Sequence, residues 1–124
     1  MPSLRARTAF AWAAQLVAAA ILGMAGLSKL AGTADSVALF TLLGTEPWGR
    51  IGVGSLEVLA TLLLLWPRTA MVGGAVGAVL MIGAIGTHLL KIGVTYGGDP
   101  SLFIMAWTVL VASVVTIGLR RRAP

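Results

Sequence analysis

The sequence predicts an all-α integral membrane protein, a four-helix bundle with a short interfacial amphipathic helix between the first and second spans. Three observations lead to this prediction. Of the 124 residues, 58% are hydrophobic and only 10% are charged, whereas soluble domains carry roughly a quarter charged residues. Four apolar stretches are long enough to cross about 30 Å of hydrocarbon. Prolines fall between these stretches, where helices break or begin.

The four predicted spans cover about residues 10–31, 49–66, 69–91 and 101–119 of a single membrane domain, residues 1–124. The first stretch follows two arginines and therefore also has features of a signal peptide. Its apolar run is longer than the ~7–15 residues of a signal peptide, and no A-x-A cleavage site follows it. We therefore expect a first helix that is retained.

The connection TADSVALFTLLGTEPW, residues 33–48, is too apolar for a simple loop. Asp35 or Ser36 can cap a short helix through Phe40, and Gly44 can end it. Such a helix is too short to span the membrane. We expect it to lie at the outer interface or in the mouth of the bundle.

The basic residues indicate how the chain is oriented. With the amino terminus in the cytoplasm, the inner side collects Arg5, Arg7, Arg68, Arg120, Arg121 and Arg122. The outer side holds Lys29, Arg50 and Lys91 beside Asp35, Glu46 and Asp99. This asymmetry favours cytoplasmic positions for both termini. Because the net charge of +5 comes from such flanking residues, we expect the lipid bilayer and not nucleic acid as partner.

Several kinds of redox site are excluded by composition. The chain has no cysteine and one histidine, His88. It therefore cannot exchange disulfides, hold an iron–sulfur cluster through thiolates, carry covalent haem or supply two histidines to one haem. One histidine and one glutamate also make a poor zinc site, which wants three or four ligands. We expect no metal and no covalently bound cofactor.

The polar residues within the spans share helix faces with small residues. One stripe of the first span contains Gln15, Gly26 and Lys29, a second-span stripe contains Gly54, Glu57 and Thr61, and a third-span stripe contains Gly74, Gly77 and His88. Side chains lean toward the amino end of their own helix. Lys29 and His88 therefore lean inward while Glu57 leans outward, and we expect the three to converge on a polar pocket in the outer half of the bundle.

Each member of this predicted pocket also has a structural interpretation. Lys29 can extend to the lipid headgroups, Glu57 can form a purely structural ion pair, and His88 can be a satisfied core histidine. The glycines suit close helix packing. If the pocket binds a ligand, Glu57, His88, Lys29, Gln15 and Thr61 are the candidate contacts. Their chemistry suits a quinone head group, a small anion or a polar metabolite.

Four segments of the chain resemble the DoxX family of small four-span bacterial membrane proteins, namely GMAGLSKL (23–30), SVALFTLLG (36–44), GVGSLEVLATLLLL (52–65) and GAVLMIGAIGTHLL (77–90). Lys29, Glu57 and His88 match the lysine, the glutamate and the late polar residue of the family pattern. The resemblance covers about residues 10–118 and implies a multi-pass protein of the bacterial inner membrane. Named members resemble the membrane subunit of a thiosulfate:quinone oxidoreductase, and others are linked to oxidative-stress complexes.

Three functions follow as hypotheses. The first is a membrane subunit of a quinone-linked redox system, in which a soluble or membrane partner protein supplies the electrons because the chain has no redox centre of its own. The second is a small-metabolite transporter or binder, which would need a homo-oligomer because four spans are few for alternating access. The third is an assembly or scaffold protein without a ligand, in which the charged residues fix helix register. Whether the protein is itself an enzyme stays open.

Overall fold

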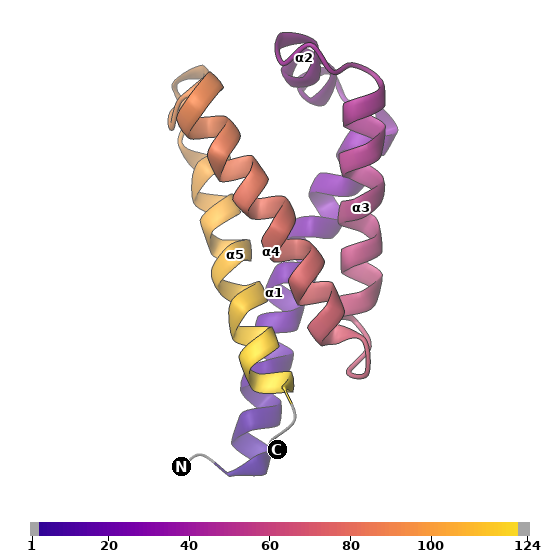
Figure 1. Ribbon diagram of the computed structural model, residues 1–124, viewed down its shortest axis with the longest axis vertical. Coiled ribbons are helices and arrows are strands. Elements are labelled where there is room, and N and C mark those ends of the chain that lie inside the picture. Colours follow the sequence, from indigo (N-terminus) through magenta and orange to yellow (C-terminus); the bar gives the residue numbers. More distant parts are fainter. Residues whose placement is uncertain (1–2, 122–124) are drawn as a thin grey trace.

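The computed structural model describes residues 3–121 and is all-helical, with five α-helices and no strand in that range (Figure 1). The helices are α1 (Leu4–Ala31), α2 (Ala34–Leu42), α3 (Trp48–Leu64), α4 (Ala70–Thr87) and α5 (Ser101–Arg120). A π-helical turn, η1 (His88–Ile92), continues α4, and a 3₁₀ turn, η2 (Tyr96–Gly98), precedes α5. The all-α class is confirmed. Arg122, part of the predicted inner basic group, lies outside the described residues.

Each long helix packs along two others. α1 and α4 both lie against α3 and against α5. The start of α1 and the finish of α5 lie at one end of the molecule, which we call the termini end (Figure 1). The short helix α2 lies at the opposite end, the α2 end. Toward the α2 end, the α4–α5 pair leans away from α1 and α3 (Figure 1).

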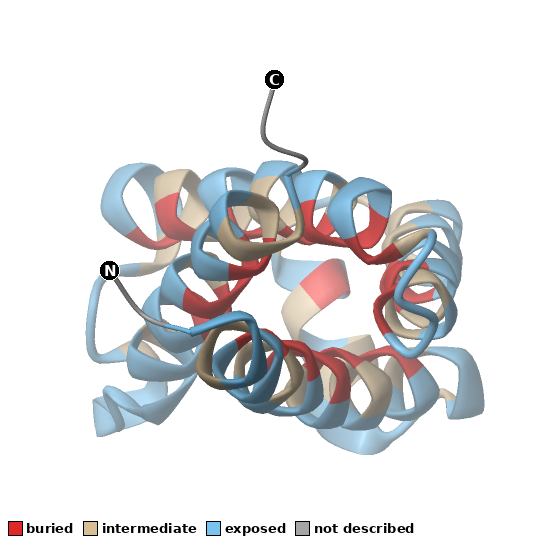
Figure 2. Cartoon of the chain, turned by 90° about the horizontal axis from the view of Figure 1, so that it is seen from below, coloured by how far each residue is buried: buried red, intermediate tan, exposed pale blue. Residues whose placement is uncertain are grey.

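The buried residues lie on the inward faces of the helices (Figure 2). Small and aliphatic side chains among them form the core. Its buried members are Ala18, Ala19, Leu22, Ala60, Leu64, Met81, Ile85, Ala106, Val109 and Ala112. A Cβ atom on Gly73 would lie 2.7 Å from the Leu64 nitrogen, and one on Gly74 would lie 2.9 Å from the Ser113 carbonyl oxygen. These glycines therefore let α4 approach α3 and α5 closely.

Three helices are long and apolar enough to cross a membrane, namely α1, α4 with its continuation to Ile92, and α5. The outward faces of these helices carry large apolar side chains, as expected for helices in a membrane. Phe10 of α1, Val79 of α4 and Val111 of α5 are 64%, 70% and 58% exposed, and a surface with so many exposed apolar residues suits lipid rather than water. The chain is a multi-pass membrane protein. α3 has 17 residues, about 26 Å at 1.5 Å per residue.

The observed helix bounds differ from the predicted spans at two places. α1 begins at Leu4 rather than near residue 10, because the Ser3 hydroxyl accepts a hydrogen bond from the Ala6 N–H at 3.0 Å and caps the helix. The third predicted span reaches Lys91, but its α-helix ends at Thr87 and the π-helical turn completes it.

The short helix α2 is present, but its N-cap differs from the predicted one. Thr33, rather than Asp35 or Ser36, is the N-cap, since its hydroxyl accepts a hydrogen bond from the Ser36 N–H. Asp35 lies in the first turn, where a carboxylate is favoured by the helix dipole. Gly44 follows the helix with φ 74°, a conformation that glycine adopts readily.

Candidate functional site

A buried ion pair joins α1 to α3. The Lys29 Nζ lies 2.9 Å from the Glu57 Oε1. The Glu57 side chain is 4% exposed and the Lys29 side chain 18% exposed. Lys29 lies in the last turn of α1, whereas Glu57 lies in the interior of α3. The structure thus brings the charged groups of two of the five candidate residues into direct contact.

Two glycines make this contact sterically accessible. A Cβ atom on Gly26 would lie 2.9 Å from the Gly54 carbonyl oxygen, and one on Gly54 would lie 2.9 Å from the Lys29 Cβ. Each charged residue follows its glycine by three positions and so shares that face of its helix. The close crossing of α1 and α3 therefore brings the Lys29 and Glu57 side chains together.

Arg50 fastens the same two helices nearer to the α2 end. Its Nε donates to both carboxylate oxygens of Glu46, at 2.9 and 2.8 Å. Its Nη1 donates to the Lys29 carbonyl oxygen, which caps the finish of α1. The sequence interpretation used Arg50 only as a boundary marker. The i,i+4 spacing of Glu46 and Arg50 was the signal that could have revealed the pair.

Thr61 lies one turn further along α3 than Glu57, and its hydroxyl is used locally. The Thr61 Oγ1 donates to the Glu57 carbonyl oxygen at 2.9 Å. A Cβ atom on Gly23 of α1 would lie 3.3 Å from the Thr61 methyl group. Thr61 therefore packs in the α1–α3 contact, beside the ion pair.

His88 is buried at the junction of α4 and η1, and its contacts are with other residues. Its Nδ1 lies 3.1 Å from the Gly93 carbonyl oxygen. Since a carbonyl oxygen only accepts hydrogen bonds, Nδ1 is the donor in this contact. The ring meets Phe103 of α5 edge-on, with centroids 5.5 Å apart. Within the described chain, no hydrogen bond joins His88 to Lys29 or Glu57.

Gln15 belongs to a second polar cluster, near the termini end. It is fully buried. Its Nε2 donates to the Leu64 carbonyl oxygen at 2.7 Å, and its Oε1 accepts from the Arg120 Nε at 2.6 Å. The Arg120 guanidinium also lies over the Trp12 ring, 5.5 Å from its centroid. Gln15 and Lys29 share a helix face but lie about 21 Å apart along the axis.

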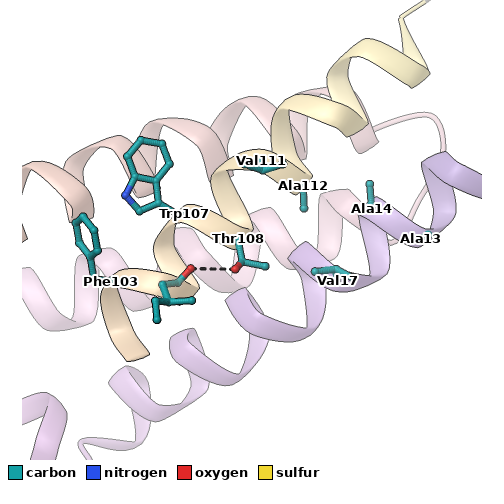
Figure 3. Close-up of a pocket in the computed structure, with 9 residues that line it drawn as sticks. Ala13, Ala14, Val17, Phe103, Trp107, Thr108, Val111 and Ala112 are labelled. Atoms are coloured by element: carbon teal, nitrogen blue, oxygen red, sulfur yellow. Dashed lines mark hydrogen bonds between the residues drawn. The ribbon is translucent and has the colours of Figure 1, made fainter. Parts of the chain in front are cut away.

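A groove of about 650 Å³ lies between α1 and α5 (Figure 3), and none of its lining residues belongs to either polar cluster. Ala13, Ala14 and Val17 line it from α1, and Trp107, Thr108 and Val111 are among the residues that line it from α5. The Thr108 hydroxyl donates to the Ile104 carbonyl oxygen at 2.9 Å, so its hydrogen bond is satisfied inside its own helix. The groove is therefore apolar in character.

No cluster of metal ligands is present in the part of the chain that the structure describes. Within residues 3–121, no three histidine, aspartate or glutamate side chains gather closely enough to hold an ion. The chemistry at Lys29 and Glu57 is thus that of one ammonium group and one carboxylate. Such a pair can donate and accept hydrogen bonds.

Comparison with known proteins identifies the family of the chain. The model of the DoxX-like family matches residues 13–116. No curated protein and no solved structure matches the chain significantly. The family match covers all of the membrane-crossing helices except the first turns of α1 and the last turn of α5. The chain therefore belongs to the DoxX-like family.

Proposed function

We propose that the protein is the membrane subunit of a quinone-linked redox system, with Lys29 and Glu57 as the contacts of the quinone head group. One observation carries the proposal. The Glu57 Oε1 is buried and lies 2.9 Å from the Lys29 Nζ, yet it has no well-aligned hydrogen bond within residues 3–121. The two charges offset each other, which matters because an unpaired charge inside a membrane costs several kcal/mol. The Glu57 Oε1 nevertheless keeps capacity to accept a hydrogen bond.

A quinone head group has the complementary chemistry. Its carbonyl oxygens accept hydrogen bonds, which the Lys29 ammonium can donate. Its reduced form presents hydroxyl groups, which can donate hydrogen bonds to the Glu57 carboxylate. When bound, the quinone supplies the electron-carrying chemistry that the side chains lack. Lys29 and Glu57 orient the head group, and a partner protein supplies the electrons.

The proposal includes a topology. α3 is the fourth span, so that α1, α3, α4 and α5 form a four-helix bundle in the bacterial inner membrane, with α2 at the outer interface. Both termini are cytoplasmic. The arginines support this arrangement. The segments that it places on the cytoplasmic side contain Arg5, Arg7, Arg68, Arg120 and Arg121, and cytoplasmic flanks are rich in arginine and lysine.

A scaffold function is the second candidate, and the α1–α3 crossing favours it. Gly26 and Gly54 leave no room for a side chain between the two helices, so the ion pair beside them can serve to fix helix register. In that case the charges carry no ligand. Exchanging both for neutral residues would then leave the function of the protein intact.

The quinone content of purified protein tests the proposal. We expect wild-type protein, purified in mild detergent, to carry quinone that is extracted with organic solvent and measured by ultraviolet absorbance. The double variant Lys29→Met/Glu57→Gln removes both charges together, so neither is left unpaired, and we expect it to lose the quinone. The matched control is Asp35→Asn, which removes an exposed carboxylate from α2 and should keep the quinone.

Two results would contradict the redox proposal. One is wild-type protein that binds no quinone when the lipid extract contains it. The other is equal quinone content in the wild type and in a folded Lys29→Met/Glu57→Gln variant. If that variant also retains its co-purifying partner protein, the scaffold function is the one supported.

A further inference from the structure

The apolar groove between α1 and α5 leads toward an arginine at the termini end. Arg7 lies seven residues before Ala14 of the groove and so faces the same side of α1. On α5, Gly118 lies seven residues after Val111 of the groove. Arg7 and Gly118 meet through a hydrogen bond at 3.0 Å. The groove and this contact therefore belong to one seam between the two helices.

Arg7 uses only part of its guanidinium in this contact. Its Nε donates to the Leu119 carbonyl oxygen at 3.0 Å, and its Nη2 donates to the carbonyl oxygens of Gly118 and Arg121, at 3.0 and 3.5 Å. Among the residues that the structure describes, Nη1 has no partner. The carbonyl contacts hold the guanidinium in a fixed position, with two N–H donors left over.

The charges around Arg7 favour an anion. All four acidic residues, Asp35, Glu46, Glu57 and Asp99, lie in α2, in α3 or in the segments that precede α3 and α5. The termini end instead carries Arg5, Arg7, Arg120 and Arg121. Within residues 3–121, no carboxylate side chain lies at that end to pair with Arg7. A phosphate group from outside these residues can supply the countercharge.

We propose that Arg7 and the apolar groove together bind one anionic phospholipid. The phosphate accepts hydrogen bonds from the Arg7 Nη1, and an acyl chain lies along the groove between α1 and α5. The spacing fits, because Arg7 and Ala14 are about 10 Å apart along the axis of α1. The volume of the groove, about 650 Å³, falls within the ~300–1,000 Å³ of ordinary ligand sites. The site is separate from Lys29 and Glu57.

Fluorescence quenching of Trp107, which lines the groove, tests the proposal. The full chain carrying Trp12→Phe, Trp48→Phe and Trp66→Phe keeps one tryptophan and is placed in phosphatidylcholine nanodiscs. Phosphatidylglycerol or phosphatidylcholine with bromine in the acyl chains is added as quencher. We expect the brominated phosphatidylglycerol to quench at a mole fraction about fivefold lower, the preference that one basic residue gives an anionic lipid.

Matched variants separate the site from general attraction to a basic surface. We expect Arg7→Gln to abolish the roughly fivefold preference, whereas Arg68→Gln, which removes an exposed arginine between α3 and α4, keeps it. Ala14→Leu fills the groove and should reduce quenching by both lipids. Ala20→Leu places the same side chain on an exposed position of α1 outside the groove and should not.

Three results would overturn the proposal. Equal quenching by the two brominated lipids would exclude an anionic headgroup site. Equal effects of Arg7→Gln and Arg68→Gln would reduce the preference to surface charge. Quenching that falls as more protein copies enter each nanodisc would mean that a second copy of the chain, rather than a lipid, covers the groove. If Arg7→Gln fails to fold, the two brominated lipids compared on the unchanged Arg7 protein test the headgroup preference, and Ala14→Leu compared with Ala20→Leu tests the groove.

Discussion

Lys29 and Glu57 are the residues whose removal should be most informative, because each is the electrostatic partner of the other. The Glu57 side chain is nearly excluded from solvent, and the Lys29 side chain is only partly accessible. Removing one member of a buried pair leaves the other as an unpaired charge, whereas removing both together is often neutral. The stability of single and double variants therefore reports whether Lys29 and Glu57 pair with each other as the structure indicates.

We predict that Glu57→Gln alone lowers the free energy of unfolding by about 3 kcal/mol, at the lower end of the range for buried pairs because Lys29 keeps some solvent contact. Lys29→Met should have an effect of similar size, and the double variant should recover most of the loss. Unfolding in detergent, followed by circular dichroism, measures all three. Additive effects of the two single changes would contradict the pairing of these residues.

Among the helices, the α1–α3 crossing carries the geometry of the candidate site, and we predict that it is sensitive to one methyl group. Gly54→Ala places a Cβ 2.9 Å from the Lys29 Cβ and 3.1 Å from the Gly26 carbonyl oxygen. We expect it to lower the free energy of unfolding by about 1–3 kcal/mol, the usual cost of overpacking. Thermal unfolding in detergent measures the change.

Gly52→Ala is the matched control, two positions away on the same helix. A Cβ at Gly52 meets nothing within 4 Å, and alanine is a better helix former than glycine by about 1 kcal/mol. We therefore expect Gly52→Ala to be neutral or stabilising. Equal destabilisation by the two substitutions would show that α1 and α3 do not approach each other as closely as described.

The elements also show what sequence reasoning can and cannot supply. Helical periodicity placed Gly26 with Lys29 and Gly54 with Glu57, and close helix packing then made their contact predictable. The same periodicity grouped Gln15 with Lys29, because a stripe defines a face but not a depth along the helix. Gln15 in fact bonds to Leu64 and Arg120.

The contacts of His88 could not be predicted for a different reason. His88 is buried, as the α-helical period predicts, but that period does not predict the π-helical turn that begins at this residue. Gly93 ends that turn with φ 84°, a conformation suited to glycine, and its carbonyl oxygen accepts the hydrogen bond of the His88 ring. Local patterns of apolar residues do not reveal such a change of helical period.

In the molecule as a whole, the charged residues and their contacts differ between the α2 end and the termini end. The Lys29–Glu57 ion pair joins the finish of α1 to α3, and the Arg50–Glu46 ion pair joins α3 to the segment before it. The other end is held by Arg7 on the carbonyl groups at the finish of α5 and by Arg120 on Gln15. Within residues 3–121, carboxylate side chains thus balance cations at the α2 end and not at the termini end. In a membrane protein, such a difference in charge between the two ends indicates which end faces the cytoplasm.

We predict that the termini end faces the cytoplasm and that α3 crosses the membrane. Since the chain has no cysteine, single cysteines report on position without interference. In right-side-out membrane vesicles, Asp35→Cys in α2 should react with a membrane-impermeant maleimide, whereas Ser3→Cys and Arg68→Cys should react only after permeabilisation. Arg68 follows α3, so its side of the membrane decides whether the 17 residues of α3 span the bilayer. Labelling of Arg68→Cys and Asp35→Cys from the same side would contradict the fourth span, and labelling of Ser3→Cys in intact vesicles would reverse the orientation.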